Sequence, residues 1–176
     1  MKVLAFDGET GVLRVELPGF PNYEVFNVPV ETFESMQSAD SPIGYFNEHI
    51  WGMKFEHDSH WPSLEALLGY MGEHMFFDPP VTVQTVLGDG DTPLHVASIW
   101  GDISAIELLI MGGAEVNARG DMGTTPIYNA VEYEWVRCVA LLLSAGATID
   151  DPNRLGFTAR QVVHMNKNPI LLDMIS

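Results

Sequence analysis

Positions 56–60 form the one cluster with metal-ligand chemistry in this sequence, and they read Glu-His-Asp-Ser-His. Zinc binds histidine nitrogens and carboxylate oxygens, but a site needs three or four such ligands that converge on one point. His57 and His60 lie three residues apart, and His49 or His74 could complete a set. A polar linker between two domains explains the same residues and is the favoured interpretation. We therefore predict no bound metal.

Cys138 is the single cysteine of the chain. It cannot form an internal disulfide, which is typical of a reducing compartment. It could act as a nucleophile, but no neighbouring histidine and aspartate arrangement in the sequence would activate it. A small packing residue on a helix is the more common role. The sequence also lacks a glycine-rich phosphate loop, a Gly-x-Ser-x-Gly elbow and a His-Glu-x-x-His helix. We expect no enzymatic activity and no cofactor.

Acidic residues dominate the composition, because 24 Asp and Glu stand against 8 Lys and Arg, for a net charge of −16. No lysine or arginine lies between Lys54 and Arg119. Such a field repels the phosphates of nucleic acids and of anionic membranes, and it accelerates the encounter with a basic protein. Solubility alone is the alternative explanation. The interval contains ten carboxylates: Glu56, Asp58, Glu65, Glu73, Asp78, Asp89, Asp91, Asp102, Glu107 and Glu115.

The sequence contains no run of about 18 apolar residues, so we expect no transmembrane helix. The apolar stretch within residues 1–8 is too short for a secretory signal, and an acidic residue follows it too early. The expected location is the cytoplasm, and the expected partners include neither nucleic acid nor a membrane.

The C-terminal half repeats itself at an offset of 33 residues. Residues 90–97 (Gly-Asp-Thr-Pro-Leu-His-Val-Ala) align with residues 123–130 (Gly-Thr-Thr-Pro-Ile-Tyr-Asn-Ala). The same offset aligns residues 113–117 with residues 146–150, and a third phase begins at residue 156. A fixed period of this length predicts a stack of identical structural units, since one unit cannot bury its apolar face alone.

The repeat resembles the ankyrin family, whose period and Thr-Pro-Leu-His-x-Ala signature both match. The resemblance covers residues 86–176, with two full repeats and one truncated repeat. It departs from the signature at Tyr128 and Asn129, and Glu134 replaces the usual glycine between two helices. The resemblance implies a structural role for His95, which in this family hydrogen-bonds between neighbouring loops. It also implies a protein-binding function.

Residues 1–60 predict a different unit. Two apolar strands flank residues 7–11, a third strand covers residues 23–28 after a turn at residues 18–22, and two short helices follow. This β-β-β-α-α pattern resembles the KTSC family, a small domain found at the C-terminus of lysyl-tRNA synthetases. The resemblance covers about residues 3–52, and its matching residues are 11–15, 23–29 and a last cluster of 39–41, 45–47 and 49–50. The family tends to carry basic residues beside the last cluster. This chain has Pro42, Ile43, Glu48 and Trp51 there.

The predicted fold class is therefore α+β, a small N-terminal β-β-β-α-α unit followed by a short helical ankyrin solenoid. We expect a KTSC-like domain at residues 1–60, a linker with a capping helix at 61–85, and ankyrin repeats at 86–176. Residues 63–71 are the candidate cap, because they are amphipathic and a short stack needs cover at its first repeat.

In the ankyrin family the loop tips and first helices project from the concave side of the stack, which predicts a binding surface by register. Trp100 and Tyr133 occupy the same register position, and large aromatics ringed by carboxylates are typical of a binding hot spot. Alternatively, Trp100 and Ile99 pack against the N-terminal domain. The predicted partner-binding residues are Asp89, Asp91, Ile99, Trp100, Asp121, Met122, Thr124, Glu132, Tyr133, Arg154, Leu155 and Phe157.

Three functions fit these features. The first is an acidic inhibitor or immunity protein that blocks a basic toxin or effector, such as a nuclease, in the manner of several compact bacterial antitoxins. The second is a general ankyrin adaptor, in which each half holds a different protein. The third is an RNA-linked accessory protein, suggested by the KTSC resemblance and opposed by the charge.

Overall fold

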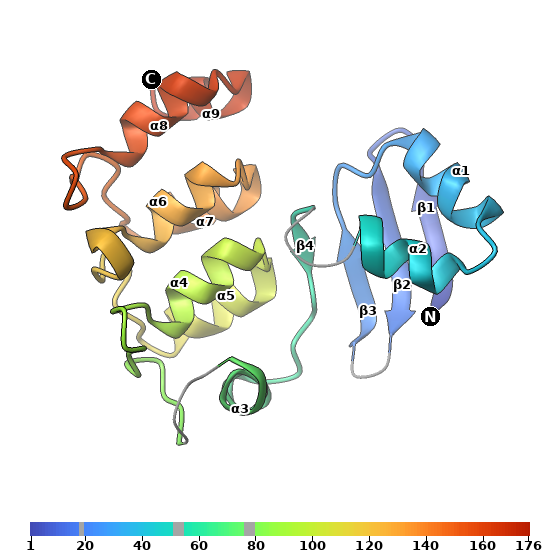
Figure 1. Ribbon diagram of the computed structural model, residues 1–176, viewed down its shortest axis with the longest axis horizontal. Coiled ribbons are helices and arrows are strands. Elements are labelled where there is room, and N and C mark those ends of the chain that lie inside the picture. The colour runs from blue at the N-terminus through green and yellow to red at the C-terminus, as the bar shows by residue number, and fades with distance from the viewer. Residues whose placement is uncertain (18–19, 51–54, 76–79) are drawn as a thin grey trace.

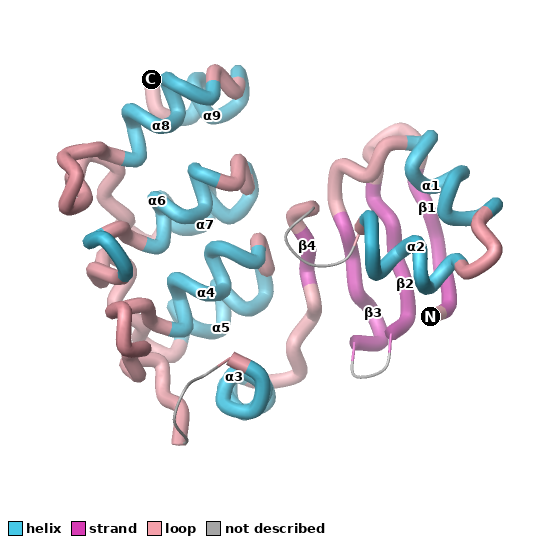
Figure 2. Tube along the Cα trace, in the orientation of Figure 1, coloured by secondary structure: helices cyan, strands magenta, loops and turns pink. Residues whose placement is uncertain are grey.

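A computed structural model describes residues 1–17, 20–50, 55–75 and 80–176 of the chain. A small sheet with two helices lies beside a stack of helix pairs (Figure 1). An extended segment runs between the two parts (Figure 2). This architecture confirms the predicted α+β class. Trp51, and Pro18 and Gly19 of the second predicted turn, lie outside the described residues.

The sheet is an antiparallel meander of β1 (Lys2–Asp7), β2 (Val12–Leu17) and β3 (Phe20–Val25), with the short β4 (His57–Asp58) paired to β3. The β1–β2 turn needs a glycine, because Gly11 has φ +70° and an added Cβ would lie 3.1 Å from the carbonyl oxygen of Val28. β3 is shifted from the predicted strand over residues 23–28. Asn27 adopts a left-handed φ of 59°, which ends the extended backbone before Val28.

Helices α1 (Val30–Ser38) and α2 (Pro42–His49) complete the core of this unit. Alternate residues of β2 and of the second half of β3 point inward because successive side chains in a strand face opposite sides. Ser41 begins α2, and its Oγ accepts a hydrogen bond from the backbone N–H of Gly44 at 3.2 Å. The buried residues are Leu13, Val15, Leu17, Tyr23, Val25, Val28, Met36, Phe46 and Ile50.

The C-terminal part stacks three helix pairs on a single helix at its N-terminal end (Figure 1). The third unit, expected to be truncated, contains both of its helices, and the second has only six residues. The elements are α3 (Leu64–His74), α4 (Pro93–Trp100), α5 (Ile103–Met111), the 3-10 turn η1 (Asp121–Gly123), α6 (Pro126–Glu132), α7 (Val136–Ser144), α8 (Ala159–Asn166) and α9 (Pro169–Met174).

The first helix of each pair begins at a threonine. Thr92, Thr125 and Thr158 precede α4, α6 and α8, and Oγ1 of the latter two accepts hydrogen bonds from the backbone N–H three residues on, at 3.4 and 3.2 Å. Pro93 and Pro126 follow, at a position where the helix leaves the backbone N–H unpaired in any case. The local sequence therefore fixes where each pair starts.

Helix α3 lies against α5 at the N-terminal end of the stack, within the segment predicted to cap it. Its Leu67 and Met71 are fully buried in the core that the stack shares. Ser63 begins this helix by accepting a hydrogen bond from the backbone N–H of Ala66 at 3.1 Å.

Gly101, between α4 and α5, offers a direct test of the packing between repeats. It has φ +73°, and an added Cβ would lie 2.9 Å from ring atoms of the buried Trp135. We expect Gly101→Ala to lower the free energy of unfolding by about 2–4 kcal/mol, since it combines backbone strain with overpacking. Urea unfolding measures the loss.

Gly113→Ala is the matched control, because Gly113 has φ +87° and open space around a Cβ. It should lose about 1–2 kcal/mol, from backbone strain alone. Equal losses in the two variants would contradict the contact with Trp135.

Candidate functional site

A hollow of about 330 Å³ lies between the loop tips and the first helices of the first two pairs. It includes eight of the residues predicted to bind a partner: Asp91, Ile99, Asp121, Met122, Thr124, Glu132, Tyr133 and Leu155. Tyr128, Asn129 and Asn153 complete the lining. The structure thus brings together residues that the sequence places in three different repeats.

Helix α6 supplies one wall of the hollow. Tyr128 and Glu132, like Asn129 and Tyr133, are four residues apart and so lie on one face of the helix. Asn129 is buried, whereas Glu132 and Tyr133 are exposed at the helix end. The wall therefore presents an aromatic ring and a carboxylate side by side.

The loop tips are held by hydrogen bonds between side chains and the backbone, one of which joins two repeats. Oδ1 of Asp91 accepts a hydrogen bond from the backbone N–H of Asp121 at 2.9 Å. Oδ1 of Asp121 accepts one from Met122 N–H at 2.7 Å, and Oγ1 of Thr124 donates to the Asp121 carbonyl at 2.8 Å. Met122 adopts a left-handed φ of 50° and remains 42% exposed. Strained, exposed positions of this kind concentrate at binding sites.

His95 connects the two loops from beneath. Its Nδ1 lies 3.2 Å from the backbone nitrogen of Thr92, and its Nε2 lies 3.2 Å from the carbonyl oxygen of Thr124. Burial lowers the pKa of His95, more than the nearby Asp91 raises it. A neutral ring suits both contacts, because Nδ1 can then accept from Thr92 and Nε2–H can donate to Thr124. This is the inter-loop role that the resemblance implies.

The charges at the hollow are unbalanced. Among the described lining residues, Asp91, Asp121 and Glu132 are acidic and none is lysine or arginine. The carboxylate of Glu132 makes no hydrogen bond or ion pair with another described residue. Arg119, a nearby cation, is engaged elsewhere, because Nη1 donates to the carbonyl of Gly123 at 3.0 Å and Nη2 lies 3.5 Å from Asp151. The hollow therefore suits a basic group from outside the chain.

Trp100 does not line the hollow. It is half-buried at the end of α4, packs against the core of the stack, and meets the ring of Tyr70 in α3 edge-on, with centroids 6.3 Å apart. The alternative, in which Trp100 and Ile99 pack against the N-terminal domain, differs from these contacts, because Trp100 packs on the capping helix and Ile99 lines the hollow. Sequence register alone could not separate Trp100 from Tyr133, because the difference arises from what covers the first repeat.

Asp89, Arg154 and Phe157 also lie outside the lining. Oδ1 of Asp89 accepts a hydrogen bond from the backbone N–H of Asp91 at 3.0 Å, and the Arg154 N–H donates to the Met122 carbonyl at 2.8 Å. These residues shape the loop tips around the hollow.

The histidine cluster does not gather metal ligands. Within residues 1–17, 20–50, 55–75 and 80–176, no group of three or more His, Cys, Asp or Glu is arranged to hold a metal ion. Nδ1 of His49 and Nδ1 of His74 each contact the backbone oxygen of the residue one turn earlier in the same helix. His57 is buried, stacks on Tyr23 with centroids 5.1 Å apart, and lies 3.7 Å from Asp102 through Nε2.

Residues 55–61 join the two parts of the molecule by pairing with both, and we call them the junction segment. Its β4 residues pair with β3, and the backbone N–H of His57 donates to the carbonyl of Gly101 at 2.9 Å. These polar residues lie between the two parts of the molecule, as the linker interpretation expected, but His57 and Ser59 are buried, so the segment is packed rather than exposed to solvent. The sequence could not show this, because polar residues mark both exposed linkers and buried hydrogen-bonded segments.

Glu56 and Asp102 anchor the junction segment. Oε1 of Glu56 accepts a hydrogen bond from the backbone N–H of Cys138, in the first turn of α7, at 2.7 Å. Asp102 accepts hydrogen bonds from the backbone N–H of Ser59 at 3.3 Å and from Nε1 of Trp61 at 2.8 Å. Burial raises the pKa of the Cys138 thiol well above its ordinary value, so the thiol stays neutral and unreactive.

Glu56 should make the stability of the chain depend on pH. Burial raises its pKa from the ordinary 4.5, more than the hydrogen bond from Cys138 lowers it, and its Oε2 has no hydrogen-bond partner among the described residues. A group whose pKa is raised by folding contributes most at low pH, and that contribution is lost as the pH rises through the folded-state pKa. Glu56→Gln should keep the hydrogen bond from Cys138, and its free energy of unfolding should not fall in this way as the pH rises.

Urea unfolding of both proteins between about pH 4 and pH 8 measures the effect. The difference in unfolding free energy, Gln variant minus wild type, should grow as the pH rises. Glu31→Gln on the exposed start of α1 is the control and should show no such trend. A difference that stays flat with pH would contradict the raised pKa.

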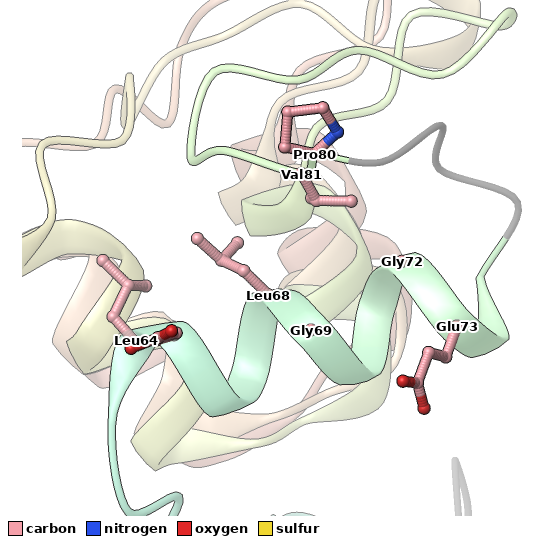
Figure 3. A pocket seen from close by; sticks show the side chains of 8 residues that line it. Leu64, Leu68, Gly69, Gly72, Glu73, Pro80 and Val81 are labelled. Carbon is pink, nitrogen blue, oxygen red and sulfur yellow. The ribbon is translucent and has the colours of Figure 1, made fainter.

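A second hollow of about 700 Å³ lies along α3 (Figure 3). Leu64 and Leu68 of the helix and Pro80 and Val81 of the following segment form its apolar lining, and Leu68 points toward Val81. Gly69, Gly72, Glu65 and Glu73 complete the lining. This hollow lies at the N-terminal end of the stack and shares no lining residue with the first one.

Among the described residues, no helix is both long and apolar enough to span a bilayer.

Comparison with known proteins places both parts of the chain. Residues 59–159 match the family of ankyrin repeats in three copies, and residues 1–55 match the KTSC domain. B-cell lymphoma 3 protein of Homo sapiens is 34% identical over 88 residues, which are 48% of this chain and 19% of that protein.

Two further relatives are similar over shorter segments. Ankyrin repeat domain-containing protein 37 of Xenopus tropicalis is 32% identical over 73 residues, 42% of this chain and 45% of that protein. A putative ankyrin repeat protein of Rickettsia bellii is 35% identical over 60 residues, 34% of this chain and 25% of that protein. The chain therefore spans less than half the length of each of these relatives.

Proposed function

The chain belongs to the ankyrin-repeat family, and from that premise we propose that it is an acidic interaction protein that binds and blocks a basic effector, such as a toxin. The proposed binding site is the hollow of about 330 Å³ at the loop tips, which we call the concave hollow. Ankyrin stacks use their extended concave surfaces for binding protein partners. The finer proposal depends on the chemistry of the hollow.

One observation carries the proposal: the lining combines three carboxylates with exposed apolar side chains and no lysine or arginine among the described lining residues. Tyr133 and Leu155 offer apolar contact area at the rim, where they are 39% and 66% exposed. A basic side chain can lay its aliphatic part along such residues while its charge meets the carboxylates. The remaining negative charge of the chain would steer a basic partner toward this face.

Inhibition is supported by the overall charge and by the rigidity of the site. Loop tips that are already hydrogen-bonded lose little conformational entropy on binding, so a complex can be tight. Once bound to a basic effector, the carboxylates of the hollow would cover the surface with which the effector binds phosphate groups. We propose no catalytic role for the chain.

The experiment is co-expression of the chain with the effector encoded beside it, together with co-purification of the two. We expect a stable complex and survival of the host cell. Failure to recover a complex, with a host that is still killed, would reject the inhibitor.

A general adaptor is the second candidate, supported by the presence of two structurally distinct parts. It predicts two partners that bind the full-length chain at once. Substitutions on the concave hollow would release one of them, and substitutions on the sheet would release the other.

A further inference from the structure

We propose that the hollow along α3 is a second docking site, which takes a short amphipathic segment of another protein with apolar residues at its centre and lysine or arginine at both ends. This inference is independent of the concave hollow, because the two surfaces share no residue. Figure 3 shows the residues that carry it.

The position of α3 in the stack is the first observation. Repeat proteins usually end in a unit with a polar outer face, because an apolar end would be exposed to water. Here the end helix contributes Leu64 and Leu68 to an open apolar hollow. Both are only partly buried, at the edge of the apolar stripe on which Leu67 and Met71 are fully buried. Leu64 and Leu68 also pack against the core of the stack, so the apolar surface that stays open among the described residues is the part of their side chains that lines the hollow.

Gly69 is the second observation. It lies in the interior of an 11-residue helix, where glycine is less stable than alanine. The fold gives no reason for it, because Gly69 has an ordinary helical φ and an added Cβ would meet nothing within 4 Å. An exposed glycine on a helix lets another backbone approach closely. Glycine at this position therefore favours the close approach of a bound segment and does not favour the stability of the free helix.

The charges define the segment. Glu65, Gly69 and Glu73 are spaced four residues apart and form one row along the helix surface, with a carboxylate one turn to each side of the glycine. Neither glutamate makes a hydrogen bond or ion pair with another described residue. No lysine or arginine occurs between residues 54 and 119 to neutralise them.

A segment that runs along this row, closest to α3 at Gly69, would thus meet negative charge near both ends and the apolar lining of the hollow beside its centre. A second copy of this chain is disfavoured as the occupant, because its net charge of −16 would bring like charges together. An anionic membrane is disfavoured for the same reason.

The probe is a synthetic helical peptide of about ten residues, the length of α3, with leucines on one face and lysines at both ends. Binding to the full-length chain is measured by fluorescence anisotropy. Replacing the terminal lysines by glutamates should weaken binding at least about tenfold. Gly69→Trp should weaken it by a similar factor by filling the crossing point. Gly88→Trp is the matched control, since Gly88 also has open space around a Cβ, and should bind like the wild type.

Gly69→Ala gives the sharpest readout, because its two expected effects have opposite signs. The melting temperature should rise by about 2–4 °C, since alanine favours the helix. Peptide affinity should fall by about threefold or more, because the added methyl group separates the two backbones. Glu132→Lys on the concave hollow should leave peptide binding unchanged.

Three results would overturn the proposal. The first is equal binding of the lysine and glutamate peptides, and the second is loss of binding in Glu132→Lys but not in Gly69→Trp. The third is that the chain binds no peptide but associates with itself, and that Gly69→Trp abolishes this self-association. That result would assign the hollow to a second copy of the chain.

Discussion

Replacing Asp102 by alanine should lower the free energy of unfolding by about 3–5 kcal/mol, one of the largest losses expected for a single substitution in this chain. Asp102 is 1% exposed and lies at the start of α5, where its carboxylate accepts hydrogen bonds from the junction segment and from α5 itself. The donors are the backbone N–H groups of Ser59 and Ala105, the hydroxyl of Ser104 and Nε1 of Trp61.

The size of this effect follows from what alanine leaves behind. Removing the carboxylate leaves several donors without a partner, some of them buried, and each buried unsatisfied donor costs about 1–3 kcal/mol. Asp102→Asn should lose less. Its remaining oxygen can serve the donors at Oδ1, but its amide N–H₂ would face Trp61 Nε1–H, which is also a donor.

Urea unfolding monitored by tryptophan fluorescence is the measurement, with Asp40→Ala as the control at an exposed carboxylate in the N-terminal unit. The expected order of stability is wild type and Asp40→Ala, then Asp102→Asn, then Asp102→Ala. A loss below about 1 kcal/mol for Asp102→Ala, within the usual range for surface changes, would contradict the junction described above.

The junction also marks the limit of what the sequence could predict. The 33-residue offset, the Thr-Pro pairs and the apolar helix faces are local or periodic signals, so the repeats and their register were predictable. The contact between Ser59 and Asp102 joins residues 43 positions apart. Nothing in either local pattern reveals that pairing, and the polar run at residues 56–60 was therefore predicted to be a linker.

The candidate site likewise divides into residues that periodic signals predicted and residues whose position depends on long-range packing. Register predicted that Asp121 and Glu132 lie on the concave side, because each repeat presents the same positions. The packing of Trp100 on Tyr70 depends on α3, a helix outside the periodic pattern. The hollow along α3 was likewise not predicted, because its lining includes Pro80 and Val81 from an irregular segment.

Reversing the charge of Glu132 should weaken the partner complex by about 100-fold. A lysine at this position would place like charges face to face with a basic partner, and such a juxtaposition costs several kcal/mol. The fold should tolerate the change, because Glu132 is exposed at the C-terminal end of α6, where a positive charge is favourable. Tyr133→Ala should cost a further 1–2 kcal/mol or so by removing an aromatic contact at the rim.

Titration calorimetry or surface plasmon resonance with the purified partner measures these affinities. Glu107→Lys, at an exposed position of the second helix α5, is the matched control for charge. It changes the net charge by the same amount away from the hollow, so it should slow association slightly and leave the complex otherwise intact.

The most direct test of the proposed function is a parallel affinity capture from cells that express the chain, with wild type, Glu132→Lys and Glu107→Lys as baits. We expect one basic protein to be recovered with the wild type and with Glu107→Lys, and to be lost with Glu132→Lys. Recovery of the same protein by all three baits, or of a partner without positive charge, would contradict binding of a basic effector at the concave hollow.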